Sequence, residues 1–191
     1  MPALTHLRAA DYRRMRWKNG AGWTTELAVQ PDEIGATDGF NWRISIAEID
    51  ADGDFSRFPE VERSIMVLGG AGMALSVAGR GPTLLRVEDP ALAFAGEHAV
   101  QCRLIAGPTR DFNVMTRRGA YTHTLDRHTL ARPLALAGEG FVYVCTGAAQ
   151  VGALALAAGD SLRIAAVPGD SPVTLHGAAE LVVVRLHPCG A

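Results

Sequence analysis

The sequence predicts an all-β protein with two related β-barrel halves. Short apolar segments recur at roughly ten-residue spacing between Gly- and Pro-containing breaks, and helical periodicity is almost absent. There is also an internal repeat, because Arg63–Val77 resembles Phe141–Leu154 and Asp111–Met115 parallels Glu180–Val184. The offset between the paired segments is not constant, so one irregular barrel is the alternative.

Length and composition restrict the class of protein. The chain has 191 residues, of which 48% are hydrophobic and 20% charged, and this composition argues against disorder. The length fits one large domain or two small fused ones with a substantial core. The net charge of −2 gives no basic footprint, so we expect neither a nucleic-acid partner nor a membrane partner.

The sequence gives no sign of export. The first eight residues lack the apolar core of a signal peptide, and no apolar run approaches the roughly 18 residues that span a bilayer. Cys102, Cys145 and Cys189 are odd in number and widely spaced, which favours small buried residues in a reducing compartment over a disulfide. We therefore expect a cytoplasmic protein.

The elements follow in order along the chain. Residues 9–16 form a short helical turn or an irregular lead-in, after which Gly20–Gly22 turns the chain into a strand from Trp23 to Val29. A polar loop follows over residues 31–39, and Tyr121–Ala131 is expected to bridge the halves because it is more polar. The remaining strands are predicted over 41–49, 63–68, 73–77, 82–87, 91–94, 99–105, 111–117, 140–145, 149–155, 161–166, 172–176 and 180–187.

Polar residues inside these strand-like segments are the main candidates for a functional site. Five of them stand in or beside apolar runs, namely Lys18, Arg43, Arg63, Asn113 and Arg117. A buried cation needs a partner, which is either an internal carboxylate such as Glu26, Glu48 or Asp111, or the anion of a ligand. The planar fork of arginine suits a carboxylate. The set as a whole favours a small polar cavity.

No metal or nucleophile motif accompanies these residues. The histidines are His6, His98, His123, His128, His176 and His187, and no His-x-His pair is among them. Zinc or iron needs three or four converging ligands, so we expect no metal and no cofactor. Gly69–Gly72 lacks the lysine and helix of a phosphate loop, and a hairpin turn is the better interpretation.

Five ordered motifs resemble the HutD/Ves family. They are Trp17–Glu26, Trp42–Ala47, Phe55–Pro59, Arg63, and Gly107-Pro108 with Asp111, Asn113–Met115 and Arg117-Arg118. Together they cover residues 12 to 118, whereas the remainder is similar only in its general residue pattern. The chain departs from the family at Ala21, where Gly is frequent, and at Glu60–Glu62, where Gly-x-Asp is more common, which alters the turn before Arg63.

The resemblance implies an RmlC-like bicupin fold, with one cupin half at residues 1–118 and the other at 119–191. It also implies a non-enzymatic protein linked to histidine utilisation that binds urocanate or formylglutamate and regulates or limits the pathway. No catalytic residue comes with the family. On this basis Arg63 would anchor the carboxylate of a small metabolite. The other expected ligand-binding residues are Lys18, Asn19, Arg43, Asn113, Trp17 and Trp42.

Two other classes of function stay open. A metal-independent isomerase or epimerase would need an acid and a base across the barrel, such as His98 or His123 with Tyr121 or Glu48. A protein-interaction module would expose an apolar patch. A homodimer is compatible with any of these functions, and the sequence does not determine the oligomeric state.

Overall fold

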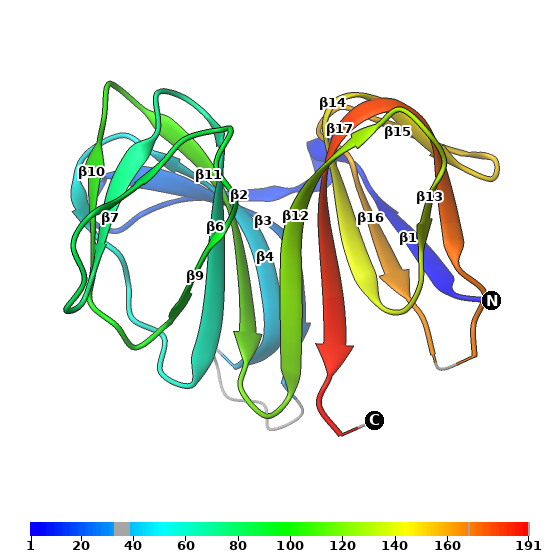
Figure 1. Cartoon of the computed structure of the whole chain (residues 1–191), viewed down its shortest axis with the longest axis horizontal. Coiled ribbons are helices and arrows are strands. Elements are labelled where there is room, and N and C mark those ends of the chain that lie inside the picture. The colour runs from blue at the N-terminus through cyan, green and yellow to red at the C-terminus, as the bar shows by residue number, and fades with distance from the viewer. Residues whose placement is uncertain (33–38, 168, 191) are drawn as a thin grey trace. The chain divides into compact units, whose positions relative to one another are not determined.

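The computed structural model describes residues 1–32, 39–167 and 169–190, and their regular secondary structure is almost entirely β-strand (Figure 1). The chain divides into two compact units. One consists mainly of Arg13–Thr122 and is called the first barrel below, and the other, called the second barrel, comprises Met1–Tyr12 with His123–Cys189. The predicted halves, 1–118 and 119–191, differ from these units chiefly in the first twelve residues. Those residues join the second barrel because Ala3–Leu7 pairs with Ser161–Ala165.

The first barrel contains two antiparallel sheets. The larger has the strand order β2-β3-β4-β11-β6-β9 and the smaller β5-β10-β7-β8. The bounds in the larger sheet are β2 Arg13–Arg16, β3 Gly22–Pro31, β4 Phe40–Ile49, β6 Val61–Gly69, β9 Leu92–Ala95 and β11 Thr109–Arg117. Those in the smaller are β5 Gly53–Asp54, β7 Met73–Val77, β8 Thr83–Leu85 and β10 Val100–Leu104.

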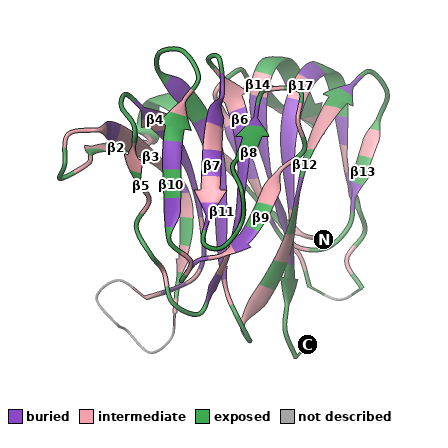
Figure 2. Ribbon diagram, turned by 60° about the vertical axis from the view of Figure 1, so that its left-hand side comes forward, coloured by how far each residue is buried: buried purple, intermediate pink, exposed green. Residues whose placement is uncertain are grey.

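Alternation of side chains along these strands builds the apolar core of the first barrel. On β7 the residues Met73, Leu75 and Val77 are buried while those between them are partly exposed, as the colouring in Figure 2 shows. They pack against Ile65 and Val67 of β6 in one cluster. Because successive side chains on a strand point to opposite faces, each sheet contributes every second residue to this core.

The second barrel is built around two long strands. β14 (Gly140–Val151) and β17 (Val173–Pro188) pair with each other, and the order in their sheet is β1-β16-β14-β17-β12, with β15 beside β14 and β13 beside β17. The shorter strands are β1 Ala3–Leu7, β12 Tyr121–Leu130, β13 Leu134–Leu136, β15 Leu154–Ala157 and β16 Ser161–Ala165, with a 3₁₀ turn at Ala9–Asp11. Their inward side chains form one apolar cluster that includes Val142, Val144, Leu162, Leu175 and Leu181.

Two glycines explain why the two long strands are continuous. The sequence predicts a break near 146–148 and another near 177–179, and both predictions are wrong. Gly147 and Gly177 lie where β14 and β17 approach closely, and a Cβ on either would come within 2.4 Å of a backbone oxygen of the other strand. The glycines therefore permit close backbone contact within the pair instead of ending its strands.

Most of the other predicted strands are confirmed to within a few residues, and β7 matches its predicted bounds, but the predicted strand 149–155 is wrong because the turn between β14 and β15 interrupts it. The segment Tyr121–Ala131, expected to bridge the halves, contains the boundary between the two units at Thr122–His123, and residues 121–130 form strand β12. This strand lies at the end of its sheet order and buries only Leu125 and Leu130 fully, so a polar composition is compatible with it. The polar loop predicted over 31–39 falls largely on residues 33–38, which are outside the described residues.

The three cysteines are free thiols. Cys102 is buried, Cys145 is partly buried and Cys189 is exposed, so the expectation of small buried residues is wrong for Cys189. Among the described residues, no helix has the length and apolar character needed to span a membrane.

Candidate functional site

A pocket of about 560 Å³ opens in the first barrel. This volume lies within the range of about 300–1,000 Å³ that is usual for small-molecule sites. Its lining combines four basic side chains, two acidic ones, neutral polar groups and aromatic rings. The lining residues are Met15, Arg16, Trp17, Lys18, Asn19, Thr24, Arg43, Ser45, Ala47, Asp54, Phe55, Ser56, Phe58, Arg63, Asp111, Asn113 and Met115.

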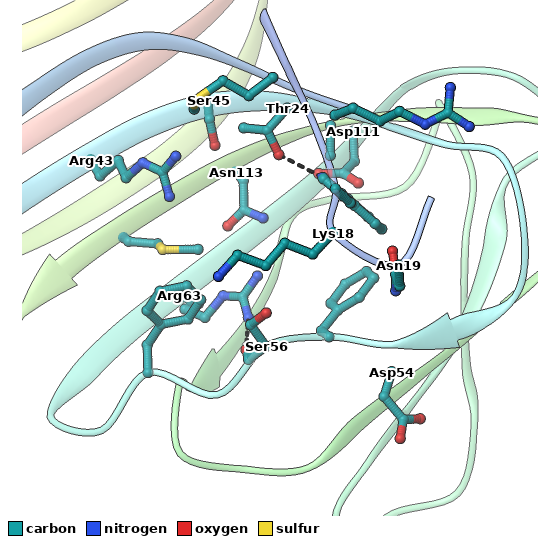
Figure 3. Close-up of a pocket in the computed structure, with 17 residues that line it drawn as sticks. Lys18, Asn19, Thr24, Arg43, Ser45, Asp54, Ser56, Arg63, Asp111 and Asn113 are labelled. Carbon is teal, nitrogen blue, oxygen red and sulfur yellow. Dashed lines mark hydrogen bonds between the residues drawn. The ribbon is translucent and has the colours of Figure 1, made fainter. Parts of the chain in front are cut away.

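Strand register places the polar residues of the pocket next to one another. On β11, Asn113 is paired with Ser45 of β4, and Met115 is flanked by Arg43 of β4 and Arg63 of β6. Residues two apart on a strand share a face, so Asp111, Asn113 and Met115 all point to the same side of the sheet. Figure 3 shows the side chains of Arg43, Asn113, Lys18 and Arg63 directed into one space.

The turn between β2 and β3 adds Trp17, Lys18 and Asn19 to the pocket. The backbone N–H of Gly20 donates to the carbonyl of Trp17 at 3.0 Å, and Gly20 adopts a φ of 72°. The Asn19 side-chain oxygen accepts from the N–H of Ala21, and Trp17 Nε1 donates to Thr24 Oγ1 at 2.8 Å. A Cβ at Gly22 would come 2.3 Å from the carbonyl oxygen of Glu48, so glycine is required there. These contacts fix the turn beside the pocket.

Arg63 is a buried cation with an aromatic surround. Its side chain lies on β6 and is only 4% exposed, and its Cζ is 5.1–5.6 Å from the ring centroids of Phe55, Phe58 and Phe94. Its Nη1 donates to the carbonyl of Ser56 at 3.1 Å, whereas its Nε has no partner among the described residues. Burial lowers the pKa of Arg63 to about 10, an effect that Asp111 opposes and Arg43 reinforces. The guanidinium is therefore charged at neutral pH.

Asp111 and Asn113 supply unused acceptors close to this cation. Asp111 is fully buried, and neither carboxylate oxygen has a hydrogen-bond partner in the described part of the chain. The side-chain oxygen of Asn113 is likewise unpaired there. Burial raises the pKa of Asp111 to about 7, although the nearby charge of Arg63 acts in the opposite direction. Such groups are uncommon in folded proteins unless a ligand or water completes them.

Several other arginines of the first barrel have internal partners. Arg43 Nε donates to Glu26 at 2.8 Å, so internal neutralisation holds for this residue. Glu48 pairs with Arg14, which in turn lies 4.3 Å above the Trp23 ring. Arg117 bonds the carbonyl of Phe40.

Arg118 follows Arg117 in the same basic pair and does not line the pocket. It pairs with Glu62 at 2.6 Å and with Glu97. Arg63 thus differs from these arginines, because no ion pair to it is found among the described residues.

The structure brings together six of the seven residues predicted to bind a ligand. Trp17, Lys18, Asn19, Arg43, Arg63 and Asn113 all line the pocket. Trp42 does not, because it lies on the opposite face of β4 from Arg43 and is completely buried. Its place in the alternation predicts this position: Arg43 and Ser45 share one face, and Trp42 and Ile44 share the other.

Several pocket residues were missed by sequence reasoning. Asp111 was considered only as a counterion, and Ser45, Met115, Phe55 and Phe58 were not proposed for the site. Counting two residues from Arg43 and from Asn113 reaches Ser45, Asp111 and Met115, so strand periodicity contained the signal. No comparable signal exists for Phe55 and Phe58, since they lie between strands and reach the pocket through tertiary folding.

The residues needed for the acid–base alternative are elsewhere. His98, His123, Tyr121 and Glu48 are absent from the lining of the pocket. That pairing therefore has no place in this cavity. Among the described residues, no group of three or more His, Cys, Asp or Glu side chains is arranged to hold a metal ion.

Comparison with known proteins identifies the family. The HutD family model matches residues 9–183. The chain belongs to the HutD family. In sequence, it is 47% identical over 115 residues to an uncharacterised 21.2 kDa protein of Pseudomonas putida from the region 3′ of hutC, covering 60% of this chain and 59% of that protein. It is 39% identical over 140 residues to protein Ves of Cronobacter sakazakii, covering 71% and 72%.

Solved structures agree with this assignment. The chain superposes on HutD from Pseudomonas fluorescens SBW25 (formate condition) with a TM-score of 0.87, at 34% identity and with 98% and 100% of the two chains covered. A cupin 2 conserved barrel domain protein from Leptotrichia buccalis, at 12% identity, has a TM-score of 0.54 over 92% and 96% of the chains and bears on the fold alone. The predicted all-β cupin fold is confirmed. A link to histidine utilisation is supported by the family match and by the genomic region named for the P. putida relative.

Proposed function

We propose that this protein is a non-enzymatic cupin that binds a small carboxylated metabolite of histidine utilisation in the pocket of the first barrel. Urocanate and formylglutamate are the candidate ligands, and occupancy of the pocket would regulate or limit the pathway. The observation that carries the proposal is Arg63, a buried guanidinium with one hydrogen bond and no ion pair among the described residues. A buried charge without a partner is strongly unfavourable, and an entering carboxylate would supply one.

The surroundings of Arg63 suit a carboxylate. Guanidinium and carboxylate groups match in a planar, bidentate geometry, and such charge-assisted bonds are strong where water is excluded. Lys18 and Arg16 add positive charge at more exposed positions of the same pocket. Phe55, Phe58 and Trp17 supply apolar walls for the carbon skeleton of a metabolite.

Calorimetric titration with urocanate, N-formylglutamate, histidine and glutamate tests the proposal. We expect at least one of the first two acids to bind and to raise the melting temperature, because a ligand that binds only the folded state stabilises it. Arg63→Met should weaken binding about 10- to 100-fold, the range for a lost charge-assisted hydrogen bond. Methionine retains much of the volume between the three phenylalanine rings, so the variant should fold.

Arg110→Met is the matched control, because Arg110 is exposed at the start of β11 and does not line the pocket. It should bind as the wild type does. The proposal is wrong if neither acid binds or if Arg63→Met retains full affinity. Recovery of the ligand unchanged after long incubation would support a binding function, whereas its conversion would favour an isomerase-type enzyme.

A further inference from the structure

The unpaired buried polar atoms of the first barrel concentrate at the pocket. Arg63 Nε, both carboxylate oxygens of Asp111 and the side-chain oxygen of Asn113 lack a hydrogen-bond partner among the described residues. All three side chains line the pocket, and each is less than a tenth exposed. Because buried polar groups are nearly always paired, such a cluster indicates groups that a ligand completes.

These atoms are not of one kind, and their arrangement gives the pocket a direction. Asp111 and Asn113 are acceptors at consecutive same-face positions of β11. Arg63, a donor, is paired with Met115, the next same-face position along that strand. Same-face neighbours on a strand are about 7 Å apart. The donor and the acceptors thus come from different positions along the wall of one pocket.

We propose that the pocket selects carboxylic acids that also carry an N–H donor, with the ligand carboxylate at Arg63 and the N–H directed to the side-chain oxygens of Asn113 and Asp111. This inference rests on the proposed function, since it presupposes that Arg63 holds a carboxylate. The N–H contact is a second recognition element beside Arg63. It should exclude from the pocket simple carboxylates and analogues that have an oxygen in place of the N–H. A site built to bond an N–H strongly rejects an analogue that lacks it, because its buried acceptors are then left unpaired.

Proton linkage gives an independent readout of the Asp111 contact. Burial holds the pKa of Asp111 at about 7, so part of the population is protonated near neutral pH. An N–H donor in direct contact stabilises the ionised carboxylate and lowers the pKa of Asp111, an effect that should outweigh the opposing charge of the ligand carboxylate held at Arg63, so binding should release protons. Arg63 of β6 is the charged group that acts on the pKa of Asp111, Arg43 of β4 acts in turn on that of Arg63, and the Cys102 thiol of β10 interacts with Asp111 electrostatically. The pKa of Cys102 is raised to about 12, so this thiol stays protonated.

Matched ligands test the inference. 3-(Pyrrol-2-yl)acrylate and 3-(furan-2-yl)acrylate have the same shape and carboxylate, and differ in carrying N–H or O at one ring position. If the flexible acid is the one that binds in the first titration, N-formylglutamate and its ester analogue 2-(formyloxy)pentanedioate form the corresponding pair. We expect the N–H member to bind about 10- to 100-fold more tightly, with proton release between pH 6 and 7.5 in buffers of different ionisation enthalpy.

Variants then assign the discrimination to residues. Asp111→Leu and Asn113→Leu should each reduce the preference for the N–H ligand, and proton release should disappear in Asp111→Leu. Should that variant fail to fold, Asp111→Asn serves instead, since it keeps the shape but cannot titrate. Asp126→Asn is the matched control, because Asp126 is exposed in the second barrel and should leave both readouts unchanged.

The outcomes separate this inference from the proposed function. If no acid of either pair binds, both fail. If the N–H and N–H-free members bind equally, this inference fails while carboxylate binding at Arg63 stands. A preference that persists in both leucine variants, or proton uptake in place of release, would also overturn the assignment to Asp111 and Asn113.

Discussion

The two barrels have similar strand arrangements but differ in the side chains that point into them. In the second barrel, the inward positions of β14, β16 and β17 are occupied by Val, Leu and Ile, and these side chains fill the space. In the first barrel, corresponding inward positions on β4, β6 and β11 carry Arg43, Arg63, Asp111 and Asn113 around a pocket of about 560 Å³. The second barrel therefore has an apolar core, whereas the first barrel combines an apolar core with a polar cavity.

The difference shows that a few inward residues decide what a cupin-type barrel can do. Unpaired polar atoms at a site lower the stability of the ligand-free protein and are tolerated where they contribute to binding. We expect the first barrel to show this trade-off and the second barrel to behave as an ordinary core.

The largest effect should come from emptying the second core. Leu162→Ala removes a fully buried side chain and should lower the free energy of unfolding by about 2–5 kcal/mol. Ligand affinity of the folded protein should be unchanged, because every lining residue of the pocket belongs to the first barrel. Urea unfolding followed by circular dichroism measures the loss. All three tryptophans, Trp17, Trp23 and Trp42, lie in the first barrel, so their fluorescence reports on that unit separately.

The result would contradict the comparison if Leu162→Ala weakened ligand binding as strongly as Arg63→Met does. Leu4→Ala is a suitable control. Leu4 lies on β1 of the same barrel, is 39% exposed and should change stability much less.

A smaller, pH-dependent effect is expected from Asp111. Its pKa is about 7 in the folded protein, against an unfolded value of about 3.9. Between these values the folded protein binds more protons than the unfolded chain, so the free energy of unfolding contributed by Asp111 falls as pH rises from about 4 to 7. Below about pH 4 the contribution is fully present. The expected change is on the order of a few kcal/mol.

The non-titrating variant Asp111→Asn isolates this contribution. The stability of the wild type relative to Asp111→Asn should decline between pH 4.5 and 7.5, as measured by urea unfolding at each pH. Asp160 is a control whose contribution to the free energy of unfolding should depend on pH with the opposite sign. Despite some burial, hydrogen bonds from Ala9 and His6 hold the pKa of its carboxyl below the usual range. A constant difference between wild type and Asp111→Asn across that range would show that Asp111 does not titrate as described.

Sequence reasoning reached the fold and much of the pocket for identifiable reasons. Two-residue alternation and Gly/Pro breaks located most strands, and the cations in strand context located Arg43 and Arg63. It failed where a glycine has a tertiary purpose, since Gly147 and Gly177 resemble turn residues but serve close contact between β14 and β17. It also failed for Trp42, which belongs to a site motif but faces away from the cavity.

What could not be predicted is which cations would be neutralised internally. Arg43 and Arg63 have similar sequence surroundings, yet Glu26 reaches Arg43 across adjacent strands, whereas no carboxylate bonds Arg63 among the described residues. That distinction depends on strand register and side-chain reach, which one sequence does not specify. It is also the distinction on which the proposed function rests.

The smallest expected effect concerns backbone strain before β6. Among the described residues, Glu60 is the one non-glycine with a positive φ, at 61°, and it belongs to the first barrel, whereas the positive-φ residues of the second barrel are glycines. The sequence departs here from the family's more frequent glycine. Glu60→Gly should therefore raise the free energy of unfolding by about 0.5–1 kcal/mol, because glycine adopts this conformation without steric penalty.

Thermal unfolding measures this change, and Glu88→Gly is the matched control. Glu88 is also exposed and in a turn but lacks a positive φ, so glycine there should be neutral or destabilising. If the strain at Glu60 also helps to place Arg63, three residues further on, Glu60→Gly should weaken ligand binding while raising stability. Unchanged affinity in a stabilised Glu60→Gly protein would show instead that β6 fixes Arg63 without help from the turn, and that the difference between the two barrels lies in their inward side chains alone.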